Sequence, residues 1–436
     1  MLFTSNDHRL KPYRPGQDGA FGRAEVAHLL GRTELGATAA RAAKIEALGL
    51  SQALDNILAF DDAKESALYR RHLRLGSRIG RRQELSLLQA QWLQRFLSAR
   101  RPLREHLALF WHDHFATSNF KVKDTVAMQI QNEIFRLGAA GPFDELLEKI
   151  ARDPAMLTWL DNDSNTKVSP NENFARELFE LFSLGLGNFD ERDVKESARA
   201  FTGWGVKARR FHFEATQHDE NPKFVLDRMG KLDGGDVLAA IAESGASDRF
   251  VATKLFRWFV RPDIDETLAA ALGQLFADCE RCTGPFLKRI LGSRIFFEPA
   301  SRAVLFRSPV QLVVAVLRTL NANVNAIELA KHCRMMGQDL FNPPSVEGWK
   351  GGRSWINSSA LVARQNFGQA LIEGEADSLK ARSREETSAL KPWVSAILTG
   401  GQAAIDTKPE KAPRLIGEGS TRLVGECLFM SQVHLF

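Results

Sequence analysis

The sequence predicts a mainly α-helical protein, a large multi-helical globular domain with a small β-hairpin insertion near residues 209–227. Apolar residues recur at the three- and four-residue spacing of a helix in most segments. Strand and helix patterns do not alternate, so nothing indicates a parallel sheet. The 436 residues are 44% hydrophobic and 25% charged, a composition that can bury a core without disulfides or a structural metal.

The predicted elements begin after an N-terminal extension, residues 1–20, which is rich in proline and glycine. Helical spacing of apolar residues predicts the first helices over 25–30, 37–48, 51–59, 84–99 and from Pro102 onward. We expect one helical domain over 21–372. Residues 373–436 are predicted to form a C-terminal helical segment and a polar linker, packed on the same domain.

The segment 169–185 is predicted to be one complete helix. Ser169 is a suitable N-cap, Pro170 suits the first helical position and Glu172 completes an S-x-x-E capping box. Gly185 can end the helix. Most of its circumference is apolar, which indicates that the helix is mostly buried.

A narrow polar stripe on this helix is the first candidate site. It contains Asn173, Arg176, Glu177 and Glu180, and Asn171 stands just before it. Ion pairs at i,i+4 from Arg176 to Glu172 and to Glu180 would satisfy Arg176 and Glu180. Asn173 and Glu177 are left without a local partner. Two carboxylates three residues apart can also act as acid and base or bridge a metal.

A polar segment interrupts the helices and holds the second candidate site. Residues 210–215 and 223–226 partly alternate polar and apolar side chains around a turn at 217–222, which predicts a hairpin. His218 and Asp219 in that turn, with Lys223 after it, are either a ligand or acid–base pair or an ordinary polar turn. Helices are predicted again over 190–202, 236–244, 248–259, 264–278, 309–321 and 327–336.

The segment Phe110-Trp-His-Asp-His-Phe115 is the third candidate site. In extended backbone His112 and His114 would share a face and chelate a metal easily. In a helix they lie about 200° apart and cannot share an ion. The preceding residues are helical in pattern. The alternative to a metal-binding pair is therefore that one histidine packs in the core and the other caps backbone carbonyls.

A loop rich in proline, glycine and tryptophan, residues 341–355, is the fourth candidate site. Its two prolines and its glycines fix an irregular backbone. Trp349 and Trp355 either form a binding wall or cap the helical core.

Charge and cysteine content exclude little. The net charge is +5, and the arginine-rich run 70–82 is either a nucleic-acid patch or a solvated surface. Cys279 and Cys282 lie in a segment that reads as helix, and no second ligand pair completes a zinc site. Packing is therefore favoured over a redox or metal role. No transmembrane-length apolar run and no signal peptide are visible, which predicts a soluble, cytoplasmic protein.

Several segments, in this order, resemble the bacterial domain-of-unknown-function family 1800 (DUF1800). The resemblance runs from about residue 26 to about residue 367. The matching segments are Phe110-Trp-His-Asp-His-Phe115, Asp153-Pro-Ala-Met156, Trp159-Leu-Asp-Asn162, Asn171-Glu-Asn-Phe-Ala-Arg-Glu-Leu-Phe-Glu-Leu-Phe-Ser-Leu-Gly185, Asp193-Val-Lys-Glu-Ser-Ala-Arg-Ala-Phe-Thr-Gly-Trp204, His218-Asp219 with Lys223, Ser308-Pro-Val310, Met336-Gly-Gln-Asp-Leu-Phe341, Pro343-Pro344 and Gly348-Trp349.

The resemblance implies a large all-helical domain without a settled activity. It also implies a candidate partner, because genes of this family often lie beside those of the DUF1501 family, which resembles sulfatases and alkaline phosphatases. Many members carry export signals, so export is the alternative to a cytoplasmic location. This chain departs from the family pattern at Lys350, where proline is usual, and at its last residues, 428–436.

Together these patterns predict an enzyme or ligand-binding protein with one polar pocket. Glu177, Glu180, His218 and Asp219 are the candidate catalytic residues. The candidate ligand-binding residues are Asn171, Asn173, Arg176, Lys223 and Trp349. His112 and His114 are the candidate ligands of a divalent metal, for which hydrolysis is the simplest chemistry. The alternative is a non-enzymatic helical scaffold that binds a partner such as a DUF1501 protein.

Overall fold

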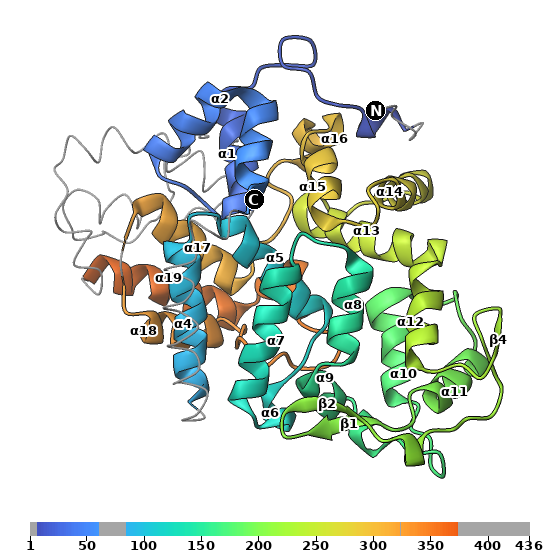
Figure 1. Cartoon of the computed structure of the whole chain (residues 1–436). Coiled ribbons are helices and arrows are strands. Elements are labelled where there is room, and N and C mark those ends of the chain that lie inside the picture. Colours follow the sequence, from blue (N-terminus) through green and yellow to red (C-terminus); the bar gives the residue numbers. More distant parts are fainter. Residues whose placement is uncertain (1–6, 61–83, 323, 374–436) are drawn as a thin grey trace.

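The fold, shown in Figure 1 as a computed structural model, is mainly helical, as predicted. The structure describes residues 7–60, 84–322 and 324–373. These ranges contain eighteen α-helices and two antiparallel two-stranded sheets. The arginine-rich run 70–82 and the predicted C-terminal segment lie outside the described residues.

The helices of the N-terminal half are α1 (Arg23–Glu34), α2 (Ala39–Leu58), α4 (Leu85–Ser98), α5 (Pro102–His114), α6 (Asn119–Val122), α7 (Thr125–Gly138), α8 (Phe143–Ala151), α9 (Pro154–Trp159), α10 (Asn173–Glu177) and α11 (Glu191–Ala200). Those of the C-terminal half are α12 (Gly234–Ala242), α13 (Gly245–Phe259), α14 (Glu266–Asp278), α15 (Thr283–Leu291), α16 (Arg294–Phe297), α17 (Pro309–Leu320), α18 (Ala326–Met335) and α19 (Ser358–Glu373).

Local capping explains where several of these helices begin. Asp190 caps α11 with Asp193 in a reciprocal box. Ser308 and Gln311 form the same arrangement at the start of α17, where Pro309 takes the first helical position. In both cases a short polar side chain accepts a backbone N–H that the helix itself cannot satisfy.

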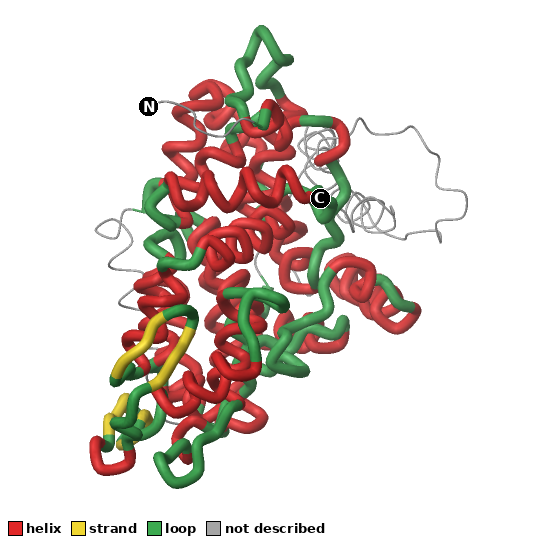
Figure 2. Tube along the Cα trace, turned by 90° about the vertical axis from the view of Figure 1, so that its right-hand side faces the viewer, coloured by secondary structure: helices red, strands yellow, loops and turns green. Residues whose placement is uncertain are grey.

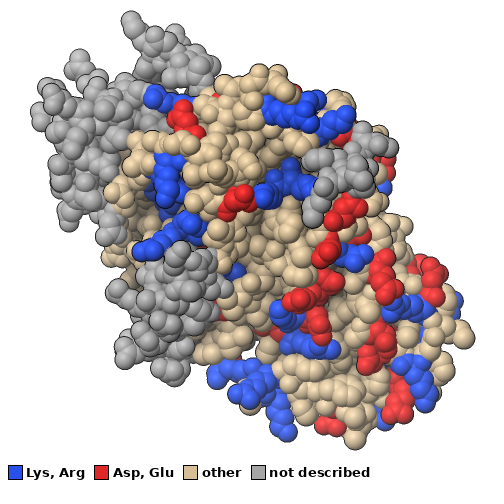
Figure 3. Space-filling model, turned by 45° about the horizontal axis from the view of Figure 1, so that its top comes forward, with Lys and Arg blue, Asp and Glu red and all other residues tan. Residues whose placement is uncertain are grey.

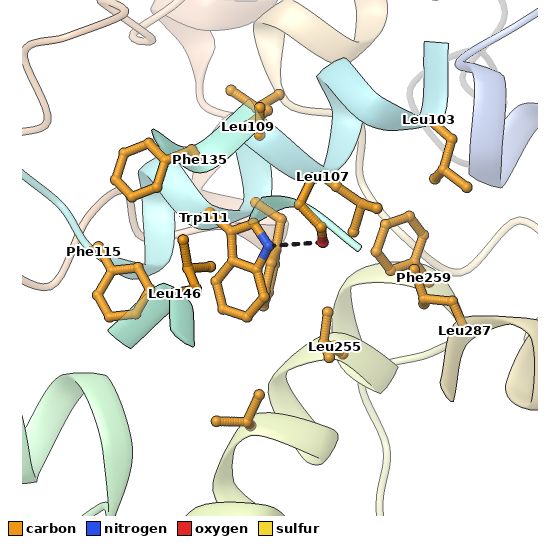
Figure 4. Close-up of a cluster of buried hydrophobic side chains, with 14 of the residues drawn as sticks. Leu103, Leu107, Leu109, Trp111, Phe115, Phe135, Leu146, Leu255, Phe259 and Leu287 are labelled. Atoms are coloured by element: carbon orange, nitrogen blue, oxygen red, sulfur yellow. Dashed lines mark hydrogen bonds between the residues drawn. The ribbon is translucent and has the colours of Figure 1, made fainter. Parts of the chain in front are cut away.

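Helix α5 occupies the centre of the core. Trp111 is fully buried, and its indole N–H donates to the carbonyl of Ala139 over 3.1 Å (Figure 4). Around it gather leucines and phenylalanines from α7, α8, α13 and α15. The C-terminal turn of α5, which carries the two predicted metal-binding histidines, is therefore held in a rigid and largely apolar setting.

The described part of the N-terminal extension is docked on the helices. The N–H of Tyr13 donates to the carbonyl of Gly292 over 2.8 Å, and Leu10 is buried. Arg9 forms an ion pair with Asp265 at the start of α14. These contacts join residues more than 250 positions apart and close the end of the molecule that includes α15 and α16.

The polar insertion contains two hairpins instead of the single one predicted. Strand β1 (Trp204–Lys207) pairs with β2 (Arg210–Phe213), and β3 (Lys223–Val225) pairs with β4 (Arg228–Gly230). The prediction that 210–215 pairs with 223–226 is therefore wrong. Both hairpins lie at the same end of the molecule (Figure 2).

The C-x-x-C segment also differs from its prediction. Helix α14 ends at Asp278, so Cys279 and Cys282 flank a turn and not a helix. Glu280 and Arg281 between them have positive φ angles of 54° and 55°. An α-helix cannot continue through two such residues.

One face of the molecule carries both basic and acidic side chains. On the face in Figure 3, basic and acidic side chains lie among one another and do not form one continuous basic surface. No helix among the described residues is long and apolar enough to span a bilayer.

Candidate functional site

The three polar residues at the end of α5 have three different partners. His112 Nε2 accepts the backbone N–H of Phe341 over 3.1 Å, and Asp113 Oδ1 accepts that of Trp349 over 2.9 Å. Burial lowers the pKa of His112 to about 3, so its imidazole is neutral and can act as this acceptor. His112 and Asp113 thus anchor the loop 341–355 to α5.

His114 instead holds the segment 178–183 in place. Its Nε2 lies 2.9 Å from the carbonyl oxygen of Phe182, and its Nδ1 lies 3.3 Å from Lys254 Nζ. A carbonyl only accepts, so Nε2 carries the proton and Nδ1 is free to accept from the ammonium group. Lys254 also donates to the carbonyl of Leu181 over 2.9 Å. Burial lowers the pKa of Lys254 to about 8.

The segment that receives these bonds is a π-helix, Leu178–Ser183, and this corrects the prediction of one α-helix over 169–185. Helix α10 begins only at Asn173, whose N–H is accepted by the Asn171 side chain over 3.0 Å, so Ser169 is not its N-cap. A π-helix shifts carbonyls away from their α-helical partners. His114 and Lys254 supply donors to two of them.

Most of the predicted polar stripe is engaged in structural contacts. The amide groups of Asn171 and Asn173 donate to the carbonyls of Asp161 and Leu160, over 3.3 and 3.1 Å. Asn173 therefore does have a partner, but one that lies thirteen residues earlier. Arg176 pairs with Glu172, as predicted, but its second partner is Glu191 and not the predicted Glu180.

Glu177 and Glu180 are the exceptions in this stripe. Neither has an ion pair or side-chain hydrogen bond with another described residue. Burial raises the pKa of Glu177, and the negative charges of Glu180 and Glu347 raise it further. The charge of Arg176 opposes this shift, but it is outweighed, so the two carboxylates stand near a third one without an ion pair to a described residue.

The His218–Asp219 turn forms a separate closed network. His218 Nδ1 lies 2.9 Å from the carbonyl oxygen of Thr202, and Asp219 pairs with Arg199 over 2.7 Å. Lys223 is buried and donates to the carbonyls of Asp219 and Asn221. The pKa of Asp219 is about 2: burial opposes this shift, but hydrogen bonds from Arg199 and Asn221 outweigh it. These bonds hold the turn that precedes β3 to the C-terminal end of α11.

Two substitutions should separate these roles. His218→Ala is expected to lower the free energy of unfolding by about 1–2 kcal/mol, because it removes a bond that holds the turn. Glu177→Gln should change it by no more than about 0.5 kcal/mol or raise it slightly, because burial and the neighbouring carboxylates outweigh the attraction of Arg176 and already disfavour the charge of Glu177. Urea denaturation of both variants measures this. A loss above about 1 kcal/mol for Glu177→Gln would mean that the carboxylate has a structural partner.

The anchored loop 341–355 also lines a cavity of about 470 Å³, which we call the Asp113 pocket. Its apolar walls include Trp258, Trp349 and Trp355, and its polar lining includes Asp113, Ser308, Gln311 and Gln338. Exposed charged side chains, Arg257, Asp263 and Arg353, lie at its rim. A few polar groups in a mostly aromatic concavity are typical of small-molecule sites.

Two polar groups in this pocket have unused bonding capacity. Asp113 uses Oδ1 for Trp349, and its Oδ2 has no partner among the described residues. Burial raises the pKa of Asp113 to about 6. Gln338 accepts from the N–H of Val310 over 2.9 Å through Oε1, which leaves its Nε2 without a described partner. One acceptor and one amide donor therefore line the same cavity.

The histidines of α5 position the tryptophan walls of the pocket. Trp258 donates its indole N–H to His106 Nε2 over 2.9 Å. The His112 ring packs edge-on against Trp349, with ring centroids 5.6 Å apart. Gly348 has φ of +81°, and a Cβ there would lie 2.6 Å from Asp113 Oδ1. Glycine is thus needed where the loop backbone meets Asp113.

The structure does not bring the predicted site residues into one pocket. Among them, Trp349 and Trp355 of the fourth candidate site line the Asp113 pocket, and Asp113 and Gln338 were not predicted as candidates. A usable signal existed, because four matching segments of the family resemblance meet here, those containing Asp113, Ser308, Gln338 and Trp349.

The metal hypothesis gains no support from the described residues. His112 and His114 lie in one α-helix and contact different neighbours, so they do not form a shared site. No group of three or more histidine, cysteine, aspartate or glutamate residues in the described ranges could hold an ion.

Among the comparisons with known proteins, the comparison with family models gives a match. Residues 28–426 match the family model described as "Protein of unknown function (DUF1800)". Neither the curated proteins nor the solved structures contain a match.

Proposed function

The chain belongs to the DUF1800 family, and from that premise we propose that it binds a small ring-bearing ligand in the Asp113 pocket, with Asp113 as its acid–base group. The observation that carries the proposal is the Asp113 carboxyl itself. It is partly buried, has one oxygen without a partner among the described residues and has a pKa raised to about 6, in a cavity walled by tryptophan. Such a group in a cleft is a candidate functional residue.

The lining supports a particular class of ligand. Three indole rings offer flat apolar surface on which a ring can stack. The rim carries Arg257 and Arg353 against Asp263, and Asp113 adds a second negative charge when it is ionised. These charges balance, which favours a neutral or zwitterionic molecule. A ligand hydroxyl or N–H would donate to Asp113, and a ligand carbonyl or hydroxyl would accept from Gln338.

The chemistry follows from the raised pKa. Near pH 7 most Asp113 side chains are ionised, but the protonated form is close in free energy, so Oδ2 can take a proton from a bound hydroxyl and return it. Lys254 lies behind it, and its positive charge favours the ionised carboxyl. This role uses no metal ion, and it replaces the hydrolysis expected from His112 and His114.

Ligand affinity is expected to depend on pH through Asp113. An ionised carboxylate is the stronger acceptor, so the affinity of a ring-bearing donor should rise up to about tenfold from pH 5 to pH 7, with a midpoint near 6. Asp113→Asn should bind with little pH dependence. Ligand-observed NMR with a library of monosaccharides and aromatic heterocycles identifies the probes, and titration at each pH measures their affinity.

Glu347→Gln serves as the matched control, because it removes an exposed carboxylate one residue from Gly348 and does not line the pocket. Its pH profile should match that of the wild type. Failure of every probe to bind the wild type, or a pH midpoint that persists in Asp113→Asn, would contradict the proposal. Failure of every probe to bind would favour the alternative, a helical scaffold that binds a partner such as a DUF1501 protein.

A further inference from the structure

The turn between α14 and α15 holds two cysteines at a spacing that suits a disulfide. The N–H of Cys282 donates to the carbonyl of Cys279 over 2.9 Å, which closes a four-residue turn. Such a turn places its first and last Cα atoms within about 7 Å, and disulfides join Cα atoms about 4.4–6.8 Å apart.

Neighbouring elements fix this turn. The N–H of Phe143 donates to the carbonyl of Arg281 over 3.0 Å, and Arg281 pairs with Asp248 over 2.7 Å. Cys282 also forms an isolated β-bridge with Pro142. Joining the two sulfur atoms therefore requires side-chain rotation more than backbone movement.

Both thiols are free and line the same open groove. Its volume is about 880 Å³, and α2 and the docked N-terminal extension form its opposite wall. Cys279 is mostly buried and Cys282 is more exposed. A small soluble oxidant that enters the groove would thus meet Cys282 first.

We propose that Cys279 and Cys282 form a reversible dithiol–disulfide pair that reacts with small disulfide oxidants such as glutathione disulfide. The Cys282 thiolate attacks one sulfur of the oxidant, which forms a mixed disulfide and releases one glutathione thiolate. The Cys279 thiolate then attacks Cys282 Sγ and releases the second. The protein loses two electrons and two protons, and glutathione disulfide becomes two molecules of glutathione.

Reaction should be slow at neutral pH. Burial raises the pKa of both thiols, and only the thiolate is nucleophilic. Below the thiol pKa, the rate should rise about tenfold for each pH unit. The charged groups that act on the pair are Asp144, Glu145, Asp278, Glu280 and Arg289.

The experiment treats the full-length protein with glutathione disulfide at pH 7 and pH 8, followed by alkylation with N-ethylmaleimide and peptide mapping by mass spectrometry. The expected wild-type product has a Cys279–Cys282 disulfide, carries no glutathione on either residue and is restored by dithiothreitol. In Cys279→Ser the second step is absent, so glutathione should stay attached to Cys282.

Cys333→Ser is the matched control, because Cys333 is buried outside the groove and its pKa is raised by burial. Its product should match that of the wild type. Three results would overturn the proposal: alkylation of both Cys279 and Cys282 after oxidation at pH 8, stable glutathione on wild-type Cys282, or a disulfide from either residue to Cys427.

Discussion

Replacing Glu105 with alanine is expected to lower the free energy of unfolding by about 3–5 kcal/mol. Glu105 is 1% exposed and lies on α5, two turns before Asp113. Its carboxylate lies 2.6 Å from Arg136 Nε and 3.5 Å from Arg95 Nε, and it accepts the indole N–H of Trp92 over 3.2 Å. These bonds join α5 to α4 and α7.

The expected loss is large because the pair is buried. In water an exposed ion pair contributes at most about 1 kcal/mol. Removal of one buried partner instead leaves the others desolvated, with an uncompensated charge. Burial alone would raise the pKa of Glu105, but the charges of Arg95 and Arg136 outweigh burial and lower it. The arginines thus stabilise the ionised form of Glu105 by more than burial destabilises it.

Thermal and urea denaturation of Glu105→Ala and Glu105→Gln test this. Because the folded-state pKa of Glu105 lies below its unfolded value, its contribution is present above about pH 4 and declines as the pH falls through the folded-state pKa. The difference between wild type and Glu105→Gln should therefore shrink in acid. Glu148→Ala, which breaks an exposed i,i+4 pair with Arg152, is the control and should cost less than about 0.5 kcal/mol. Equal losses for Glu105→Ala and Glu148→Ala would contradict the expected role of burial.

Helices with strong local signals could be predicted from the sequence. Asp190 and Ser308 are short side chains that satisfy backbone N–H groups within three residues. Their effect needs no knowledge of the rest of the molecule, and both helices begin where expected. The apolar periodicity of α4 likewise predicted a buried face, and Trp92 and Phe96 are fully buried.

The strand pairing could not be predicted because the turns lack the usual residues. Both hairpins have two-residue turns in which both residues have positive φ, Ala208–Arg209 and Leu226–Asp227. Such turns favour glycine and asparagine. Because neither turn contains glycine or asparagine, the polar run 217–222 was predicted as the turn, and it is not the turn of either hairpin. Contacts with distant elements hold these turns instead: Asp193 of α11 accepts the N–H of Leu226 over 2.9 Å, and Arg209 pairs with Asp124.

The π-helix and the Asp113 pocket depend on residues far apart in sequence. The carbonyls of Leu181 and Phe182 receive donors from Lys254 and His114, which lie about seventy residues away on either side. Without those donors, capping and periodicity favour an ordinary α-helix. Asp113 likewise becomes part of a pocket only through its contact with Trp349, 236 positions later in the sequence. No site role was therefore predicted for Asp113 itself.

Asp153→Asn is the substitution expected to raise stability most at alkaline pH. Asp153 is 1% exposed and is the N-cap of α9, where Oδ2 accepts the N–H of Met156 over 3.0 Å and the Gln131 amide over 2.8 Å. Its Oδ1 is buried without a hydrogen-bond partner. Burial raises the pKa of Asp153 to about 7, although both hydrogen bonds favour the ionised form. The side chain is thus held where its charge is poorly solvated.

The sign of the pH effect follows from this shift. The folded-state pKa of about 7 lies above the unfolded value of about 3.9, so the carboxyl contributes its full stability below pH 4 and loses it as the pH rises through 7. Three pKa units correspond to about 4 kcal/mol, which is the upper limit of the loss. Asparagine keeps an oxygen for Met156 and Gln131 but does not ionise.

Unfolding of wild type and Asp153→Asn by urea at pH 4.5, 6 and 8 measures the effect. The difference in free energy of unfolding should increase in favour of the variant between pH 4.5 and pH 8, by about 2–4 kcal/mol. A difference that does not change with pH would show that Asp153 titrates alike in the folded and unfolded chain. A wild type that gains on the variant as the pH rises would show that the bonds to Met156 and Gln131 outweigh burial. In that case Asp153 would act as an ordinary ionised N-cap.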